Sequence, residues 1–193
     1  MSETVRSFVA VPLPGEIQSR IFAAAQELAR ELPPSAGLKW SRKVENLHIT
    51  VKFLGPVGEE KLTVLGNELA QALAPVPRFR LDLRRMGAFP SAHKAGVVWA
   101  GVDDLQRGLA TVAEVVEGVG ERLGFAREQR AFTGHVTVGR SKGRGVDARA
   151  ALSAFAGRDF GGTTVEEVHV YESRLGGEGS NYVLRSRAAL ASN

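Results

Sequence analysis

The sequence predicts an α+β fold with two pseudo-symmetric lobes, each an antiparallel sheet with helices packed outside. Two observations lead to this prediction. Alternating apolar segments typical of strands are interspersed with longer segments of helical apolar spacing, and their order repeats along the 193 residues. Each half also contains one His-x-Thr tripeptide, beginning at His48 and at His135. We expect the lobes to face each other across a central cleft that carries both tripeptides.

The first elements follow from apolar periodicity and from the residues that interrupt it. Alternation over 6–11 predicts a strand, which nearby prolines end. Residues 16–32 show helical spacing and stop at a second pair of prolines. The segment 47–54 predicts the first histidine strand, and we expect Pro56 and Gly58 to break it.

A helix and a hairpin are predicted next. Leucines recur on one face of 59–73, as in an amphipathic helix. Alternating apolar residues over 79–83 predict a strand, and 95–102 predicts its hairpin partner. We expect a loop containing Phe89 and Pro90 to connect the two strands.

The second half repeats this order. Asp103 or Asp104 can cap a helix that Gly124 closes. The remaining predicted elements are the second histidine strand, a short helix and two closing strands, at 134–140, 147–156, 164–171 and 181–187. No low-complexity linker divides the chain, so we expect residues 1–193 to form a single bilobal domain.

Each histidine strand is expected to bury one face and to present an imidazole and a hydroxyl together on the other. Strict alternation divides the side chains into two sets. The residues expected in the core are Ile49, Val51, Phe53, Val136 and Val138. Those expected on the open faces are His48, Thr50, Lys52, His135 and Thr137.

Composition excludes several function classes. The absence of cysteine excludes disulfides, thiolate metal sites and cysteine nucleophiles. No two histidines have helical metal-ligand spacing, so we predict neither a metal site nor a cofactor. The sequence shows no secretory signal and no long apolar segment, and we expect a cytoplasmic protein that does not bind membranes.

The charge balance is basic, with a net charge of +4 and a pI near 9.8. Most of the 25 basic residues are arginine, whose planar fork matches phosphate oxygens. This bias favours a nucleotide or RNA partner. An alternative is that arginine richness reflects genome composition or heat tolerance.

Two opposed histidines match the demands of a displacement at phosphorus. The attacking oxygen must lose a proton while the leaving oxygen gains one on the opposite side of the phosphorus. Histidine titrates near neutrality, so one imidazole can act as base and the other as acid. The neighbouring threonines can donate hydrogen bonds to the non-bridging oxygens, where negative charge develops. This scheme requires no metal ion.

The residues that carry this pattern resemble the 2H phosphoesterase superfamily, and within it the RNA 2′,3′-cyclic phosphodiesterases once named 2′-5′ RNA ligases. The resemblance covers nearly the whole chain. The matching segments are RSFVAVPLP, NLHITVKFLG, FPSAHKAGVVWAGV, AFTGHVTVGR and VHVYESRL, followed by a late Tyr182. One departure is Gly134, where the family commonly has proline before the second histidine.

The resemblance implies an activity and roles for four residues. His48 would protonate the leaving 3′ oxygen, and His135 would accept a proton from water and so open the cyclic phosphate to a terminal 2′-phosphate. Thr50 and Thr137 would hold the phosphate. The expected partners are RNA ends or nucleotides bearing a 2′,3′-cyclic phosphate, and the expected state is a monomer without a cofactor.

Two further cations are candidates with open alternatives. Lys52 is expected on the His48 face and either meets a phosphate or is a solvated lysine. Arg140 would lie opposite His135 by strict alternation, so it is either a ligand that a twist after Gly139 brings round or an ion-pair partner. The run Arg140, Lys142, Arg144 either guides an RNA end or forms a mobile charged loop.

The other histidines and the aromatic residues have weaker claims. His93 is expected to be exposed and His169 to be structural. Trp40, Phe89 and Tyr171 either stack on a base or pack at the edge of the cleft.

Three functions are therefore compatible with the sequence. The first is metal-independent hydrolysis of 2′,3′-cyclic phosphates, and the second is a noncatalytic module that binds nucleotides or RNA. The third is a reversible ligase that forms 2′-5′ bonds with the same residues. Product analysis separates the third function from the first.

Overall fold

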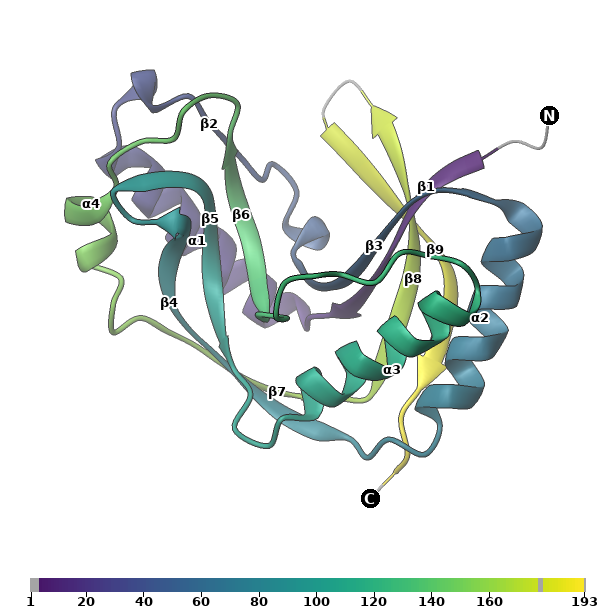
Figure 1. Ribbon diagram of the computed structural model, residues 1–193. Coiled ribbons are helices and arrows are strands. Elements are labelled where there is room, and N and C mark those ends of the chain that lie inside the picture. The colour runs from purple at the N-terminus through teal and green to yellow at the C-terminus, as the bar shows by residue number, and fades with distance from the viewer. Residues whose placement is uncertain (1–3, 177–178, 193) are drawn as a thin grey trace.

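The computed structural model describes residues 4–176 and 179–192 (Figure 1). Its strands are β1 (Thr4–Pro12), β2 (Leu38–Trp40), β3 (His48–Gly58), β4 (Phe79–Ser91), β5 (Lys94–Asp103), β6 (His135–Ser141), β7 (Asp159–Val165), β8 (Glu167–Gly176) and β9 (Gly179–Ala189). Its helices are α1 (Gly15–Glu31), α2 (Glu59–Leu73), α3 (Gly108–Arg122) and α4 (Arg149–Ser153), with short 3-10 turns at Pro34–Ala36 and Val44–Asn46.

The strands form one antiparallel sheet in the order β7-β4-β5-β6-β3-β1-β8-β9, and β2 pairs with β6 beside this path. The two halves of this order meet where β6 pairs with β3, through the single residue pair Ile49 and Val136. We call the strands β6, β5, β4 and β7 the β6 lobe, and the strands β3, β1, β8 and β9 the β3 lobe. This arrangement confirms the predicted α+β class with two pseudo-symmetric antiparallel lobes.

The helices cover the outside of both lobes (Figure 1). Helix α1 contacts β6, β7 and α4, whereas α2 and α3 contact each other and the strands β9 and β3. Helices α1 and α3 each pack on the lobe to which the preceding strand does not belong. Helix α1 follows β1 in the chain but packs on the β6 lobe. Helix α3 follows β5 but packs against β3. Each lobe therefore contains elements from both halves of the sequence.

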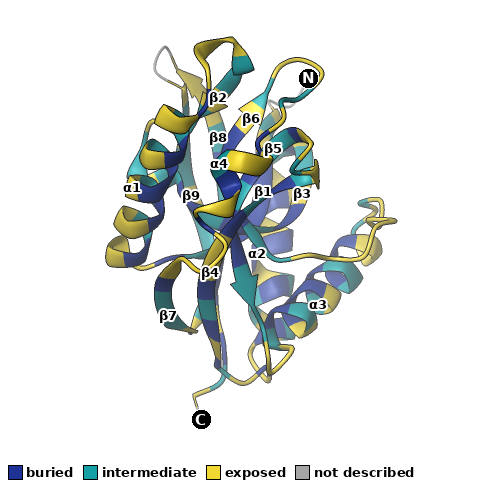
Figure 2. Cartoon of the chain, turned by 90° about the vertical axis from the view of Figure 1, so that its left-hand side faces the viewer, coloured by how far each residue is buried: buried dark blue, intermediate teal, exposed yellow. Residues whose placement is uncertain are grey.

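The core lies between the sheet and these helices. Figure 2 shows the central strands mostly buried or half-buried, while α1 and α3 carry exposed residues on one side. On α1 the buried side chains recur at helical spacing, as in Ile17, Ile21 and Leu28, and on α3 the same is true of Leu109, Val112 and Val116. Burial of these apolar stripes is the main force that holds each helix on the sheet.

Most predicted elements are present close to their expected bounds. The helix predicted over 59–73 is α2. Helix α3 begins at Gly108 with Arg107 at its N-cap position. Neither Asp103 nor Asp104 is therefore the N-cap residue, although Asp104 Oδ2 accepts the amide hydrogen of Ala110 at 3.0 Å. Gly124 closes α3 in the left-handed region, with φ of 78°, where glycine carries no steric penalty.

Three further local predictions were wrong. The expected loop around Phe89 and Pro90 is part of β4, because pairing with β5 continues to Ser91 and Pro90 sits at a register shift, where its missing N–H costs no ladder bond. Strand β3 likewise continues through Pro56, opposite Arg6. The sequence analysis also missed β2 and β7, since β2 has only three residues and β7 contains a glycine pair.

Candidate active site

The two His-x-Thr tripeptides meet at the junction of the lobes. Ile49 and Val136, their middle residues, form the pair that joins β3 to β6, and both are fully buried. Side chains on either side of a paired residue point to the opposite face of the sheet. The two histidines and two threonines therefore flank this pair on the face away from the core, and all four are half-buried.

His48 is held by its backbone and by an aromatic neighbour. Its Nδ1–H donates to the carbonyl of Asn46 at 2.8 Å, and its Nε2 lies 3.0 Å from the Thr50 hydroxyl. The imidazole stacks on Phe8 at 4.8 Å between ring centroids, and the edge of Tyr182 lies 5.3 Å away. Because the carbonyl can only accept, it selects the tautomer with hydrogen on Nδ1, so the Thr50 hydroxyl donates to the Nε2 lone pair until that lone pair takes a proton.

The surroundings of His48 favour its neutral form. Burial lowers the pKa of His48 to about 4, although the hydrogen bond to Asn46 opposes this effect. The positive charges of Arg140 and of protonated His135 lower the pKa further, so all three groups share one electrostatic environment. His48 is neutral at pH 7 in the free protein.

His135 has a matching arrangement in the other lobe. Its Nδ1–H donates to the carbonyl of Thr133 at 2.9 Å, and its ring lies edge-on to Phe89 at 5.1 Å between centroids. Burial lowers the pKa of His135, and the charge of Arg140 contributes in the same direction. Both histidines thus anchor Nδ1 on the carbonyl two residues earlier and leave Nε2 available.

A β-bulge follows each threonine and overturns part of the predicted alternation. In β3 the partners of β1 shift from Thr50 to Lys52, which leaves Val51 as the extra residue. In β6 the partners of β5 shift from Thr137 to Gly139, which leaves Val138 as the extra residue. An extra residue reverses the phase of every side chain that follows it.

The bulge in β3 makes the predictions for two residues wrong. Phe53 was expected in the core, but it is 67% exposed and lies on the face of His48, with its ring 6.3 Å from Phe8. Lys52 was expected on the open face, but it is 6% exposed and lies under α3. Lys52 is therefore not placed to bind a phosphate beside His48.

The bulge in β6 brings Arg140 to the face of His135. Its side chain is exposed, and its Nη2 donates to the Thr137 hydroxyl at 3.5 Å. Burial raises the pKa of Tyr182 and the charge of Arg140 opposes this rise, so the guanidinium acts on groups of both lobes. In the described part of the chain it forms no ion pair with a carboxylate. The ion-pair alternative thus has no carboxylate partner among the described residues, and a role of Arg140 as a phosphate ligand stays a prediction.

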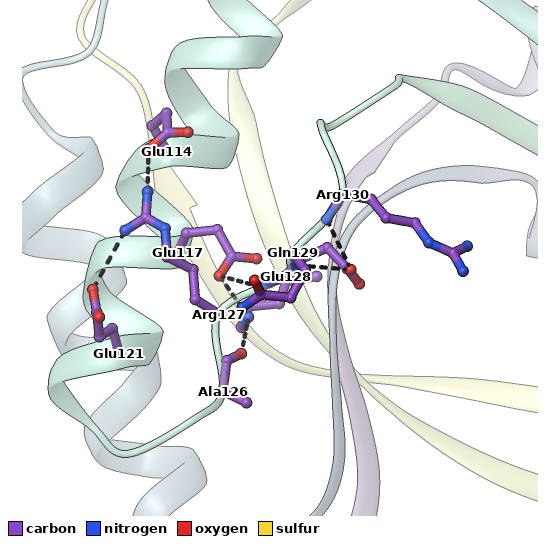
Figure 3. Close-up of polar contacts among 9 residues, drawn as sticks. Glu114, Glu117, Glu121, Ala126, Arg127, Glu128, Gln129 and Arg130 are labelled. Atoms are coloured by element: carbon purple, nitrogen blue, oxygen red, sulfur yellow. Dashed lines mark hydrogen bonds and ion pairs between the residues drawn. The ribbon is translucent and has the colours of Figure 1, made fainter.

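Lys52 instead connects β3 to the loop that precedes His135. Its Nζ donates to Glu117 Oε2 at 2.7 Å and to the carbonyl of Ala126 at 2.8 Å. The same carboxylate oxygen accepts the backbone N–H of Glu128 at 3.3 Å. Figure 3 shows Glu117 beside Ala126 and Glu128, with Arg127 between two further glutamates of α3. This cluster ties the loop after α3 to the first histidine strand.

The remaining candidates have structural partners. His93 is exposed, as predicted, and its Nδ1 lies 3.2 Å from Asp147 Oδ2. His169 is buried between Glu167 and the Tyr171 hydroxyl, at 2.6 and 2.8 Å, which agrees with the expected structural role.

Several neighbours of the histidines were given no role from the sequence. Phe8 and Tyr182 contact the His48 ring, and the carbonyls of Asn46 and Thr133 orient the two imidazoles. The sequence shows only that Asn46 and Thr133 each stand two positions before a histidine. In the described residues, no group of three or more histidine or carboxylate side chains could hold a metal ion.

The chain is similar in sequence to known phosphoesterases. A sequence model described as "LigT like Phosphoesterase" matches residues 11–99. The chain is 32% identical over 178 residues to the RNA 2′,3′-cyclic phosphodiesterase of Archaeoglobus fulgidus, which covers 92% of this chain and 96% of the relative. It is 37% identical over 132 residues to the enzyme of the same name from Aeropyrum pernix, covering 68% and 72%.

A solved structure shares the fold over almost the full length. The crystal structure of Escherichia coli LigT complexed with 3′-AMP superposes with a TM-score of 0.76 at 29% identity, covering 97% of this chain and 99% of that chain. Together with the full-length sequence similarity, this match shows that the chain belongs to the LigT-like family of 2H phosphoesterases.

Proposed function

We propose that this protein hydrolyses the 2′,3′-cyclic phosphate at the end of an RNA to a terminal 2′-phosphate, without a metal ion. One observation carries the proposal: two His-x-Thr tripeptides flank the junction of the lobes, each with its Nδ1 bound to a backbone carbonyl and its Nε2 available for a proton. The relatives from Archaeoglobus and Aeropyrum are named for the cleavage of RNA 2′,3′-cyclic phosphates, which supports the same substrate here.

The proposed reaction is an in-line displacement. His135 Nε2 accepts a proton from water, and the water oxygen forms a bond to phosphorus as the bond from phosphorus to the 3′ oxygen breaks. His48, protonated at Nε2, gives that proton to the departing 3′ oxygen. The products are a 3′-hydroxyl and a 2′-phosphate. Each proton transfer contributes on the order of 10² to 10⁴ in rate.

Neighbouring donors would stabilise the charge that develops on phosphorus. Thr50 and Thr137 lie beside the two histidines, and their hydroxyls can donate to the non-bridging oxygens. The Arg140 guanidinium lies beside Thr137 and adds a positive charge at the same place. These groups supply the electrostatic stabilisation that a metal ion supplies in other phosphoesterases.

The pKa of His48 leads to a prediction about pH. The free enzyme holds the pKa of His48 at about 4, so the acid form is lost as pH rises above that value. A bound phosphate anion favours the protonated imidazole and raises this pKa. We expect the alkaline limb of kcat, which reports the complex, to lie at higher pH than the alkaline limb of kcat/KM, which reports the free enzyme. Coincident limbs in steady-state pH profiles would contradict this prediction.

The proposal includes the setting in which the enzyme works. The sheet runs continuously through both lobes, so we propose that the whole chain acts as one bilobal domain and as a monomer, with both histidines supplied by one chain. Among the described residues, no helix has the length and apolar character needed to cross a bilayer. We propose a cytoplasmic RNA end as the substrate.

The decisive experiment follows the fate of a defined RNA end. An oligonucleotide with a 2′,3′-cyclic phosphate is incubated with the enzyme, with and without a chelator, and the products are separated by chromatography. We expect a 2′-phosphate in both samples at equal rates. A 3′-phosphate would contradict the direction of ring opening, loss of turnover with the chelator would contradict metal independence, and absence of any product would contradict the activity.

A further inference from the structure

A group of basic side chains continues from the candidate active site along β6 to β2. Strand β2 pairs with the far half of β6, and the register sets Lys39 opposite Arg140 and Leu38 opposite Ser141. Arg42 follows β2, and Lys142 follows β6. We call Lys39, Arg42, Arg140 and Lys142 the cation strip. All four side chains are exposed.

The cation strip gathers four basic side chains that lack the acidic partners found beside many other arginines of the chain. Elsewhere, arginines lie between carboxylates, as Arg185 does between Glu59 and Glu172. Within residues 4–176 and 179–192, no member of the strip forms an ion pair with a carboxylate. The side chains of Lys39 and Lys142 lie close enough to interact, and the charges of Lys142 and Arg42 lower the pKa of Lys39. Positive charges gathered in this way are stabilised by an anion from solution.

The strip also has a direction and a spacing. After the bulge at Val138, Arg140 lies on the face of His135, and Lys39, directly opposite Arg140 in the pairing of β2 with β6, points to the same face. Lys142 comes just after β6, and its side chain interacts with that of Lys39. Residues two apart on a strand are about 7 Å apart. This separation is close to that of neighbouring phosphates in an extended single strand of RNA. The strip therefore matches a series of phosphates that leads away from the reacting one.

The chemistry of the proposed substrate identifies the polyanion. A 2′,3′-cyclic phosphate requires a ribose 2′-oxygen, so the molecule that carries it at a chain end is RNA. The phosphates of the preceding nucleotides then extend from the reaction site. A strip that begins at Arg140, beside Thr137, lies where such a chain would continue.

We propose that the cation strip binds the backbone phosphates of the nucleotides that precede the cyclic end, so that the enzyme prefers an oligonucleotide to a mononucleotide. This inference rests on the proposed function. It adds a specificity surface outside the histidines and threonines, and it assigns Lys39, Arg42 and Lys142 to substrate binding and not to the chemical step. A mononucleotide has no phosphate that can reach these residues.

The test compares two substrates on one variant. The wild type and Lys39→Gln/Lys142→Gln are assayed with a nucleoside 2′,3′-cyclic phosphate and with a trinucleotide that ends in the same nucleotide. We expect kcat/KM for the trinucleotide to fall about tenfold, which is about 0.7 kcal/mol per contact, and the mononucleotide value to stay within about twofold. The slope of log kcat/KM against log salt for the trinucleotide should fall by about 1.4 in magnitude.

A matched control separates the strip from net charge. Arg30→Gln/Lys61→Gln removes the same two charges from exposed positions on α1 and α2, outside the sheet. We expect this variant to behave as the wild type on both substrates. An equal loss in both double variants would show a net-charge effect and would overturn the proposal, as would an unchanged preference for the trinucleotide in Lys39→Gln/Lys142→Gln.

Failure of the proposed function gives a different result. If the wild type hydrolyses neither substrate, the activity is wrong, and the strip is then tested by fluorescence anisotropy with a labelled trinucleotide. Weaker binding and a smaller salt slope in the strip variant, but not in the control variant, would still support RNA binding. Equal binding by the wild type and both variants would overturn it.

Discussion

His48→Ala and His135→Ala are each expected to lower kcat on a 2′,3′-cyclic phosphate by at least about 10²- to 10⁴-fold, because each removes one proton transfer. The structure supports two separate losses, since the imidazoles lie in different lobes and each has its own carbonyl anchor. The double variant should lose little beyond the worse single variant, because residues that act as a unit are not additive. Single-turnover kinetics with a cyclic nucleotide measures all three effects.

Two controls accompany this prediction. His93→Ala removes a histidine whose side chain is 71% exposed, and the kcat of this variant should equal that of the wild type. Circular dichroism of each variant checks that the fold is retained. Full activity in His48→Ala or His135→Ala, in a protein that remains folded, would rule out the proposed acid and base pair.

The acid can be distinguished from the base with a sulfur substrate. In a cyclic phosphate whose 3′ bridging oxygen is replaced by sulfur, the leaving thiolate needs no proton. The proposed roles then predict that His48→Ala regains most of its lost rate on this substrate, whereas His135→Ala does not. The reverse result would exchange the roles, because the surroundings of His48 also hold it neutral in the free protein.

Lys52→Met is expected to destabilise the fold by about 3 kcal/mol, because it removes one member of a buried ion pair and leaves the other without its countercharge. The side chains of Lys52 and Glu117 are 4% and 12% exposed. The variant also removes the hydrogen bond that Lys52 donates to the carbonyl of Ala126. Urea unfolding, monitored by circular dichroism, measures the loss.

Companion variants show that the pair, and not the volume of the side chain, is responsible. Lys52→Met/Glu117→Leu removes both charges and should recover part of the stability, since apolar replacement of a whole buried pair is often tolerated. Lys94→Met changes an exposed lysine on β5 and should lie within about 0.5 kcal/mol of the wild type. An unfolding free energy for Lys52→Met equal to that of the wild type would contradict the prediction.

The Lys52 cluster also bears on the active site. The loop it anchors ends at Thr133, whose carbonyl orients His135. We expect hydrogen exchange at residues 126–134 to rise in Lys52→Met. A rise there would show that Lys52, which has no place in the chemical step, holds the loop that leads to His135.

The sequence was informative wherever a local pattern decides the structure. Helical spacing over 59–73 and alternation around the two histidines predicted α2, β3 and β6, because apolar faces must be buried whatever the partner is. Strand alternation also predicted that each histidine shares a face with the threonine two residues later. Which face the side chains after Thr50 and Thr137 occupy could not be predicted, because a bulge depends on the register of the neighbouring strand.

Sequence alone thus determined the α+β class, the family resemblance and the two His-x-Thr tripeptides on strands that bury one face in the core. Only the tertiary structure decided that the tripeptides meet at the pair Ile49 and Val136, that α1 and α3 pack on opposite lobes, and that Arg140 faces the site while Lys52 is buried. The physical reason is that periodicity records which face of a segment avoids water, whereas register, bulges and pairing across the lobes depend on contacts between residues far apart in the chain.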